Sequence, residues 1–197
     1  GYIRPDSIKI ISYSSGELYS NYIKFGIVYE CYVSNLVDAV VAAEAAVAHQ
    51  DMFPDQADDY GPVFRATLEA AASISGADYS KARLAAAKTK MIFDTLLTDV
   101  DLLLCPGSPL PAMPLEEFPP TQVLPPEAVA AFVGFTAPMN FSGHPTISVP
   151  CGLSSENLPL GLQLVAQYND EALLIAAAHA YERATPWHTY IPTQLQS

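Results

Sequence analysis

Basic residues, cysteines and long apolar stretches are all scarce in this chain of 197 residues. Nine lysines and arginines stand against 21 acidic residues, which gives a formal net charge of −12. A nucleic-acid-binding protein is expected to carry a basic stripe, and an anionic membrane surface attracts basic segments. The charge therefore predicts no nucleic-acid partner and no membrane partner.

No apolar run reaches the roughly 18 to 20 residues that a membrane-spanning helix needs. The segment 37–48 (VDAVVAAEAAVA) comes closest, but Asp38 and Glu44 interrupt it, so a buried helix is the better interpretation. The first residues lack the basic-then-apolar pattern of a signal peptide. Three widely spaced cysteines form neither a disulfide framework nor a zinc motif. We therefore expect a reducing, cytoplasmic location, with no metal and no other cofactor.

The composition favours a globular core, because half of the residues are hydrophobic and only 15% are charged. Residues 106–126 are rich in proline, which predicts an extended loop. Glycine often ends a helix, and Gly76 is expected to end the helix predicted at about 63–75. Periodicity and helix-start signals predict helices at about 35–49, 63–75, 79–97, 126–135 and 170–184, and strands at 102–105, 147–149 and 161–166.

The helix expected at 79–97 has one side with larger apolar residues. Leu84, Ala87, Met91 and Leu96 lie on this side, and three lysines lie largely off it. Since apolar residues at helical spacing usually face a core, this side is predicted to face the interior.

Five blocks of sequence carry a resemblance to a known family, and they occur in a fixed order. The blocks are DLLLCPGSP (101–109), TAPMNFSGHP (136–145), ISVPCG (147–152), LPLGLQL (158–164) and the ending AYE with WH (180–182 and 187–188). They resemble the closing segment of the amidase signature family, whose members hydrolyse carboxylic amides through a serine nucleophile. The resemblance covers roughly residues 42–192.

The resemblance implies an α/β fold, the C-terminal part of the amidase-signature fold, with helices packed on a mixed β-sheet. Residues 37–197 would form this part of the amidase domain. Residues 1–36 match nothing in the family and are left unassigned. The residues alone, without the resemblance, indicate an α/β globular domain with a proline-rich loop.

The catalytic part of the family is missing from this sequence. The family is understood to use a serine, a second serine with a cis peptide bond, and a lysine, with a glycine-rich GGSSGG stretch around the nucleophile. This chain has two Ser-Ser pairs, Ser14-Ser15 and Ser154-Ser155, and neither has the flanking glycines. Lys9 lies much closer to the first pair than the family's lysine does. No catalytic residue is therefore assigned.

The remaining residues are expected to shape the substrate pocket. By the resemblance, the loop after the CPGSP strand and the PMNFSG turn lie near the acyl group, so Ser108, Pro109, Met139, Asn140 and Phe141 are the candidate substrate-binding residues. Each has a structural alternative. Pro109 and Phe141 are more typical of structural roles, and the Asn140 side chain can equally bond its own turn.

Two other arrangements suggest a nucleophile. Ser142 and His144 resemble a serine–histidine pair, but residues two apart in a turn rarely face each other, so structural roles are expected. Cys151 lies in apolar surroundings without a neighbouring histidine, which favours an inert thiol.

Three functions remain open at the level of sequence. The favoured one is the C-terminal part of an amidase that is inactive alone. Its partners would be a small-molecule amide substrate in the complete enzyme and the missing N-terminal half, on the same or another chain; a homo-oligomer is also open. The second is a non-catalytic amide- or protein-binding domain. The third is an independent enzyme that uses Ser142 or Cys151.

Overall fold

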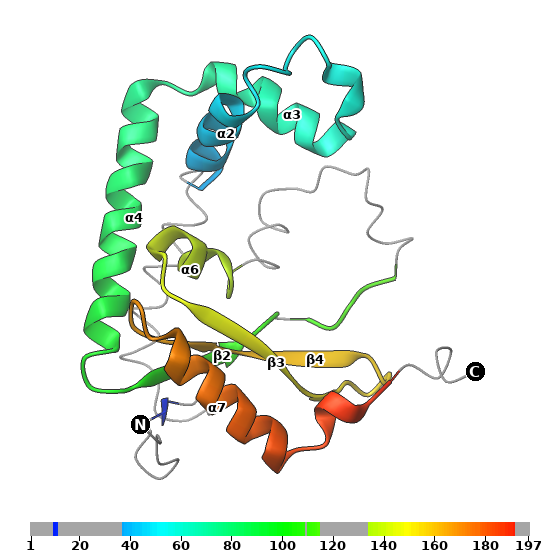
Figure 1. Ribbon diagram of the computed structural model, residues 1–197. Helices are drawn as coiled ribbons and strands as arrows, with labels where there is room; N and C mark the ends of the chain where they lie inside the picture. Colours follow the sequence, from blue (N-terminus) through cyan, green and yellow to red (C-terminus); the bar gives the residue numbers. More distant parts are fainter. Residues whose placement is uncertain (1–9, 12–36, 109, 115–133, 192–197) are drawn as a thin grey trace.

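The computed structural model describes residues 10–11, 37–108, 110–114 and 134–191 (Figure 1). Within these residues, helices and a small sheet make an α/β arrangement. The helices are α2 (Val37–Ala48), α3 (Pro62–Ala70), α4 (Gly76–Leu96), α6 (Ala137–Ser142) and α7 (Glu171–Ala184). The strands are β1 (Ile10–Ile11), β2 (Leu102–Pro106), β3 (Thr146–Leu153) and β4 (Pro159–Val165), and three short 3-10 turns lie at Ala57–Asp59 (η3), Ala71–Ser73 (η4) and Trp187–Thr189 (η5).

The four strands form one mixed sheet in the order β1-β2-β4-β3. β1 runs parallel to β2, whereas β4 is antiparallel to both β2 and β3. A short turn joins β3 to β4, and Asn157 within it has a positive φ of 62°, a conformation that asparagine tolerates better than most residues. The expected mixed sheet is thus confirmed.

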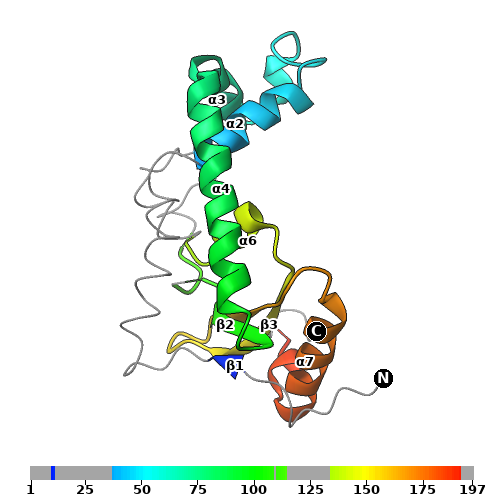
Figure 2. The same ribbon diagram turned by 90° about the vertical axis from the view of Figure 1, so that its left-hand side faces the viewer.

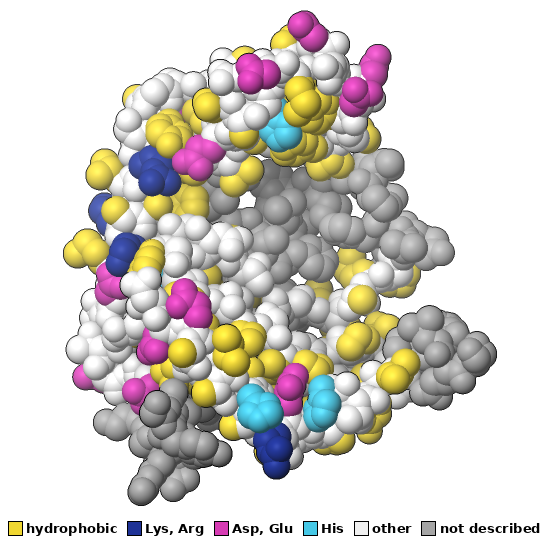
Figure 3. Space-filling model, in the orientation of Figure 1, with side chains coloured by type: hydrophobic (Ala, Val, Ile, Leu, Met, Phe, Trp, Pro, Cys, Tyr) yellow, Lys and Arg dark blue, Asp and Glu magenta, His cyan; other side chains and the backbone are white. Residues whose placement is uncertain are grey.

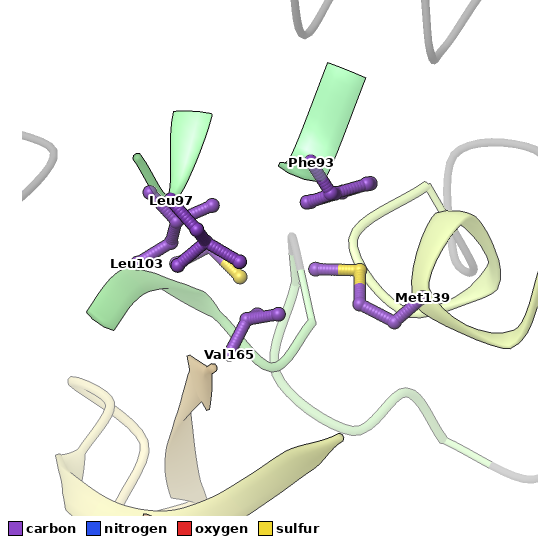
Figure 4. Packing of buried hydrophobic residues seen from close by; sticks show 6 residues of the cluster. Phe93, Leu97, Leu103, Met139 and Val165 are labelled. Carbon is purple, nitrogen blue, oxygen red and sulfur yellow. The ribbon is translucent and has the colours of Figure 1, made fainter. Parts of the chain in front are cut away.

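Side chains along each strand point alternately to the two faces of the sheet, so each face has its own buried cluster. Leu103 and Cys105 of β2 point to the face covered by α4 and α6, where they join a buried cluster with Phe93, Met139 and Val165 (Figure 4). The period of two in a strand sends the intervening residues to the opposite face. There Leu102 of β2 and Leu164 of β4 pack against Leu173, Leu174 and Ala177 of the covering helix α7.

Helix α4 links the sheet to a helical lobe made by α2, α3 and η4 (Figures 1 and 2). Its first half packs on α2 through the fully buried Ala82, which contacts Ala39 and Val40. Its second half contributes Phe93 to the sheet cluster. The small residues Ala39 and Ala82 lie at the α2–α4 contact, and the single helix α4 therefore packs against both parts of the molecule.

Two expectations about helix α4 are wrong. Gly76 does not end the preceding helix but is the first residue of α4, because Ser75 caps this helix by accepting a hydrogen bond from the Asp78 N–H at 3.1 Å. The predicted inward side is also wrong, since Leu84 and Met91 are each 66% exposed. The buried side instead carries Ala82, Ala85, Ala86, Thr89 and Phe93.

The other predicted elements within the described residues are found, but β3 ends four residues beyond the predicted strand 147–149, and the segment expected as the PMNFSG turn forms helix α6. The strands at 102–105, 147–149 and 161–166 correspond to β2, β3 and β4, and the first and last helices to α2 and α7. Helix α2 buries only one side, because Val41 and Val47 are exposed. The helix expected at 126–135 and most of the proline-rich loop lie outside the described residues.

Candidate functional site

The loop after β2 begins at Gly107, which packs closely on Gly161 of β4. The Gly107 N–H donates to the Gly161 carbonyl at 2.9 Å, and a Cβ at position 107 would lie 3.2 Å from the same oxygen. This close approach fixes the exit of the chain from the sheet. The next residue, Ser108, has an exposed side chain whose Oγ donates to the Leu110 carbonyl at 2.8 Å. Pro109 lies outside the described residues.

Helix α6 holds the other three predicted site residues, and they differ in exposure. Met139 is 2% exposed and belongs to the core beneath the helix. Asn140 is exposed, and Phe141 is half-buried against the cluster that joins α2 to α4. Of these three side chains only that of Asn140 is exposed, whereas Met139 and Phe141 pack against the core.

One buried side chain, that of Gln163 in β4, contacts both the segment before α6 and strand β2. The Gln163 side-chain amide of β4 donates to the Phe135 carbonyl at 2.8 Å and lies 3.3 Å from Cys105 Sγ. Because Gln163 is only 4% exposed, these contacts have little competition from water. Both α6 and the segment 110–114 lie above the sheet in Figures 1 and 2, on the side away from α7.

A buried polar cluster follows α6, and the sequence suggested only its Ser142–His144 pair. His144 Nδ1 lies 3.0 Å from Ser142 Oγ, so the expectation that these two side chains do not face each other is wrong. Gly143, at φ 77°, makes the left-handed turn that brings them together. On the other side of the ring, Nε2 lies 3.2 Å from Oδ1 of Asp94, with an alignment that falls short of a hydrogen bond.

Aromatic rings and a lysine complete this cluster. The His144 ring packs against Phe93 at 5.3 Å and against Tyr168 at 4.7 Å between centroids. The Tyr168 hydroxyl donates to the Ser142 carbonyl. Lys90 Nζ lies 4.1 Å from the Tyr168 ring centroid. It also forms an ion pair with Asp94, so every charged group around His144 has a partner.

The electrostatics of the cluster favour a neutral histidine. Burial lowers the pKa of His144, and the neighbouring Asp94 carboxylate opposes this only in part. The hydrogen bond from Lys90 lowers the pKa of Asp94. The cluster therefore combines a neutral imidazole with a charged Lys–Asp pair.

The order of Asp94, His144 and Ser142 resembles a catalytic triad, but the serine is not placed to act as one. Ser142 is 3% exposed, and its Oγ also lies 3.3 Å from the Met139 carbonyl and 3.4 Å from the His144 N–H. A nucleophile must reach the substrate carbonyl. We conclude that the cluster joins α4 to the start of β3 and has a structural role.

The other nucleophile candidates also have unsuitable environments. Burial raises the pKa of the Cys151 thiol and of the Cys105 thiol, whereas a reactive cysteine needs a lowered pKa. Ser154, in the second Ser-Ser pair, accepts hydrogen bonds from the Glu156 and Leu158 N–H groups at 3.2 Å each. This serine therefore closes the β3–β4 turn. Ser14 and Ser15 lie outside the described residues.

Neither a candidate metal site nor a candidate membrane span occurs within the described residues. No group of three or more histidine, cysteine, aspartate or glutamate side chains there could hold a metal ion. No helix among them is long and apolar enough to cross a membrane.

Comparison with known proteins identifies the family. The model of the family described as Amidase matches residues 10–175. This chain therefore belongs to the amidase family.

Relatives of known sequence are much longer than this chain. A Mycobacterium tuberculosis (strain ATCC 25618 / H37Rv) protein named as amidase AmiD is 34% identical over 151 residues, which are 77% of this chain and 32% of the relative. A glutamyl-tRNA(Gln) amidotransferase subunit from Lysinibacillus sphaericus (strain C3-41) is 39% identical over 126 residues, which are 64% of this chain and 25% of the relative. The chain thus spans about a third or less of these curated relatives.

Solved structures agree with the family and the fold. A crystal structure of an amidase is 27% identical, with a TM-score of 0.65 over 80% of this chain and 35% of its own. The structure of 6-aminohexanoate cyclic dimer hydrolase gives a TM-score of 0.66 over 98% of this chain and 48% of its own. Since its identity is only 20%, this second likeness concerns the fold alone. The fold is that of the amidase-signature enzymes, in its α/β form.

Proposed function

We propose that this chain is the C-terminal part of an amidase that hydrolyses carboxylic amide C–N bonds, and that it is inactive without a catalytic half. Residues 37–197 would form this part, and residues 1–36 have no assigned role, although the family match begins at residue 10. The observation that carries the proposal is the family membership of a chain that spans about a third of its relatives. The absence of a glycine-flanked Ser-Ser pair from the 197 residues supports it.

In this proposal the missing half supplies the nucleophile, and this chain supplies the rigid floor of the substrate pocket. The family's serine attacks the amide carbonyl, the amine leaves with a proton, and water releases the acyl group from the serine. Ser108, Pro109, Met139, Asn140 and Phe141 are the proposed pocket residues. Of these, Ser108 and Asn140 have exposed side chains that can contact the substrate. Met139 and Phe141 would hold α6 in position through their packing.

The proposal includes a location and partners. A cytoplasmic location is proposed, because Cys105 and Cys151 are both free thiols. The partners would be a small-molecule amide and the N-terminal half of the enzyme, on the same or another chain. Nucleic acid and membranes are not expected partners of an acidic chain.

The test compares the chain alone with a chimera. The 197-residue chain is assayed against a short aliphatic amide and an aryl amide, and then placed in the M. tuberculosis AmiD protein in exchange for its matching segment. We expect no turnover by the chain alone and measurable turnover by the chimera. Turnover by the chain alone that survives repurification would contradict the proposal; Ser142→Ala and Cys151→Ala variants would then locate the nucleophile.

Variants of the chimera test the pocket residues. Ser108→Ala and Asn140→Ala should each lower kcat/KM by about tenfold or more if the side chain binds the substrate, since that loss corresponds to about 1.4 kcal/mol. The thermal melt should not change. Ser155→Ala, an exposed serine in the β3–β4 turn, is the matched control. A folded chimera without turnover would favour the alternative, a non-catalytic amide- or protein-binding domain.

A further inference from the structure

The outer side of α4 carries a regular seam of small and apolar residues. Five exposed residues recur at alternating spacings of three and four: Ala77, Ser80, Leu84, Ala87 and Met91. This is the a/d spacing of a helix that packs lengthwise against another helix. The seam runs for about 21 Å at the helical rise per residue. In Figure 2, α4 lies in front along its whole length, and no described helix or strand covers it.

Basic residues flank the seam on both sides. Lys81 and Lys88 occupy the e positions, and Arg83 and Lys90 occupy the g positions. These four are nearly half of the nine basic residues in a chain of net charge −12. In Figure 3, dark-blue side chains lie along the edge of the molecule where α4 runs, next to yellow hydrophobic and magenta acidic ones, and a further dark-blue one lies at the bottom, away from α4.

The flanking charges can pair with a partner. Lys81, Arg83 and Lys90 have ion pairs within the chain, with Asp78 at 3.4 Å, Glu44 at 3.5 Å and Asp94 at 2.9 Å. All six side chains are at least 43% exposed, and exposed pairs contribute only about 0–1 kcal/mol. Lys81 and Arg83 can therefore exchange partners at little cost, whereas Lys90 also lies over the Tyr168 ring. No ion pair of Lys88 occurs within the described residues.

The basic residues at the e and g positions determine which partner fits the seam. In a parallel pair of α4 helices, e would face g; in an antiparallel pair, e would face e and g would face g. Both arrangements place basic residues against basic residues, so pairing with a second copy of α4 is unfavourable. A membrane surface fits poorly too, because Leu84 and Met91 are the only large apolar side chains of the seam, and membrane anchoring needs a larger apolar area.

We propose that the outer side of α4 is a docking surface for an acidic amphipathic helix of a partner protein. The partner helix would place aliphatic residues over Leu84, Ala87 and Met91 and carboxylates beside the four basic residues. Its fit rests on apolar contact for affinity and on charge for orientation and specificity. This inference does not depend on the proposed function.

The test uses two designed helical peptides with the full 197-residue chain. Each has three heptads with leucine at a and d; one carries glutamate at e and g, and the other lysine. Fluorescence anisotropy measures binding at low and high salt. We expect the glutamate peptide to bind about tenfold or more tightly than the lysine peptide and to weaken at high salt. An acidic chain should otherwise repel the glutamate peptide, so this preference is specific to the seam.

Variants assign the binding to the seam. Leu84→Glu with Met91→Glu should weaken binding of the glutamate peptide by about tenfold or more. Leu84→Ala with Met91→Ala tests the same contact if the charged pair reduces the melting temperature. Lys81→Glu with Lys88→Glu should reverse the preference between the peptides. Ala172→Glu with Ile175→Glu changes two exposed residues of α7 and makes the same charge change, so this pair is the matched control and should leave binding unchanged.

Other occupants of the surface give distinct results. Equal binding of both peptides, or binding that survives the Leu84/Met91 variants, would overturn the proposal. A dimer of the chain that these variants dissolve would assign the surface to a second copy instead. Sedimentation with anionic phospholipid vesicles, lost in the same variants, would assign it to a membrane.

Discussion

At the scale of single residues, His144 is the side chain on which separate segments converge. It follows α6, precedes β3, packs between Phe93 of α4 and Tyr168 beyond β4, and lies beside Asp94. Its side chain is fully buried. A proton added there would introduce a second positive charge near Lys90, so the contact should depend on pH.

The first prediction is a loss of stability at mildly acidic pH. Burial lowers the pKa of His144 below the usual 6.5, so between these two values the unfolded chain binds a proton that the folded chain does not. The free energy of unfolding should fall as the pH drops through 6.5, by at most about 1.4 kcal/mol per pH unit. Asp94 has a lowered pKa and titrates below this range. Denaturant unfolding at several pH values measures the slope.

A variant that cannot titrate isolates the histidine. His144→Gln should be less stable near neutral pH but should lose most of the slope between about pH 6.5 and 5.5. His179→Gln, an exposed histidine on α7, should keep the slope. An unchanged slope in His144→Gln would assign the pH dependence to another group.

At the scale of secondary structure, the sequence predicts elements better than it predicts what covers them. The strands were predictable because short apolar runs such as 102–105 are bounded by turn residues. The buried side of α4 was not, because small residues such as Ala82 and Ala85 allow close helix packing while larger ones such as Leu84 remain outside. A pattern shows that a side is apolar, but not whether a contact within the chain covers it.

The sequence pattern also does not determine where some helices end or how the site residues face each other. Gly76 could end one helix or begin the next, and only the Ser75 cap decides between them. The contact between Ser142 and His144 depends on the left-handed turn at Gly143. Of the predicted pocket residues, the sequence could not separate the exposed Asn140 from the neighbouring core residue, because a six-residue helix gives no reliable periodicity.

The second prediction concerns two glycines at helix ends. Gly143, after α6, has a positive φ, and a Cβ there would lie 2.5 Å from the Tyr168 hydroxyl oxygen. Gly143→Ala should therefore cost about 2–3 kcal/mol of unfolding free energy, from backbone strain and a disturbed hydrogen bond. Gly76→Ala meets no atom within 4 Å and should instead gain about 0.5 kcal/mol from helix propensity. Thermal or denaturant unfolding measures both.

A second substitution separates the two causes at position 143. Tyr168→Phe removes the hydroxyl that the new Cβ would meet. In that background Gly143→Ala should cost less than it does alone, and the remaining cost is the backbone strain. Equal costs in both backgrounds would contradict the predicted clash.

At the scale of the whole molecule, net charge opposes association through the sheet. Within the described residues β3 pairs only with β4, so its other edge carries unpaired backbone groups, and such edges recruit further strands. The charge of −12 keeps copies of the chain apart at neutral pH. Association should therefore rise at high salt, which screens the charge, and near the sequence pI of about 4.5.

The third prediction separates the strand edge from the charge. Thr146→Lys with Ser148→Lys changes two exposed side chains on one face of β3 and shifts the net charge from −12 to −10. Less repulsion alone would increase association, whereas lysines on an edge strand block further pairing. We expect light scattering to show less association. Ala66→Lys with Ala70→Lys on α3 makes the same charge change far from the edge and should increase association. If both pairs increase it, charge governs the association and the β3 edge has no part in it.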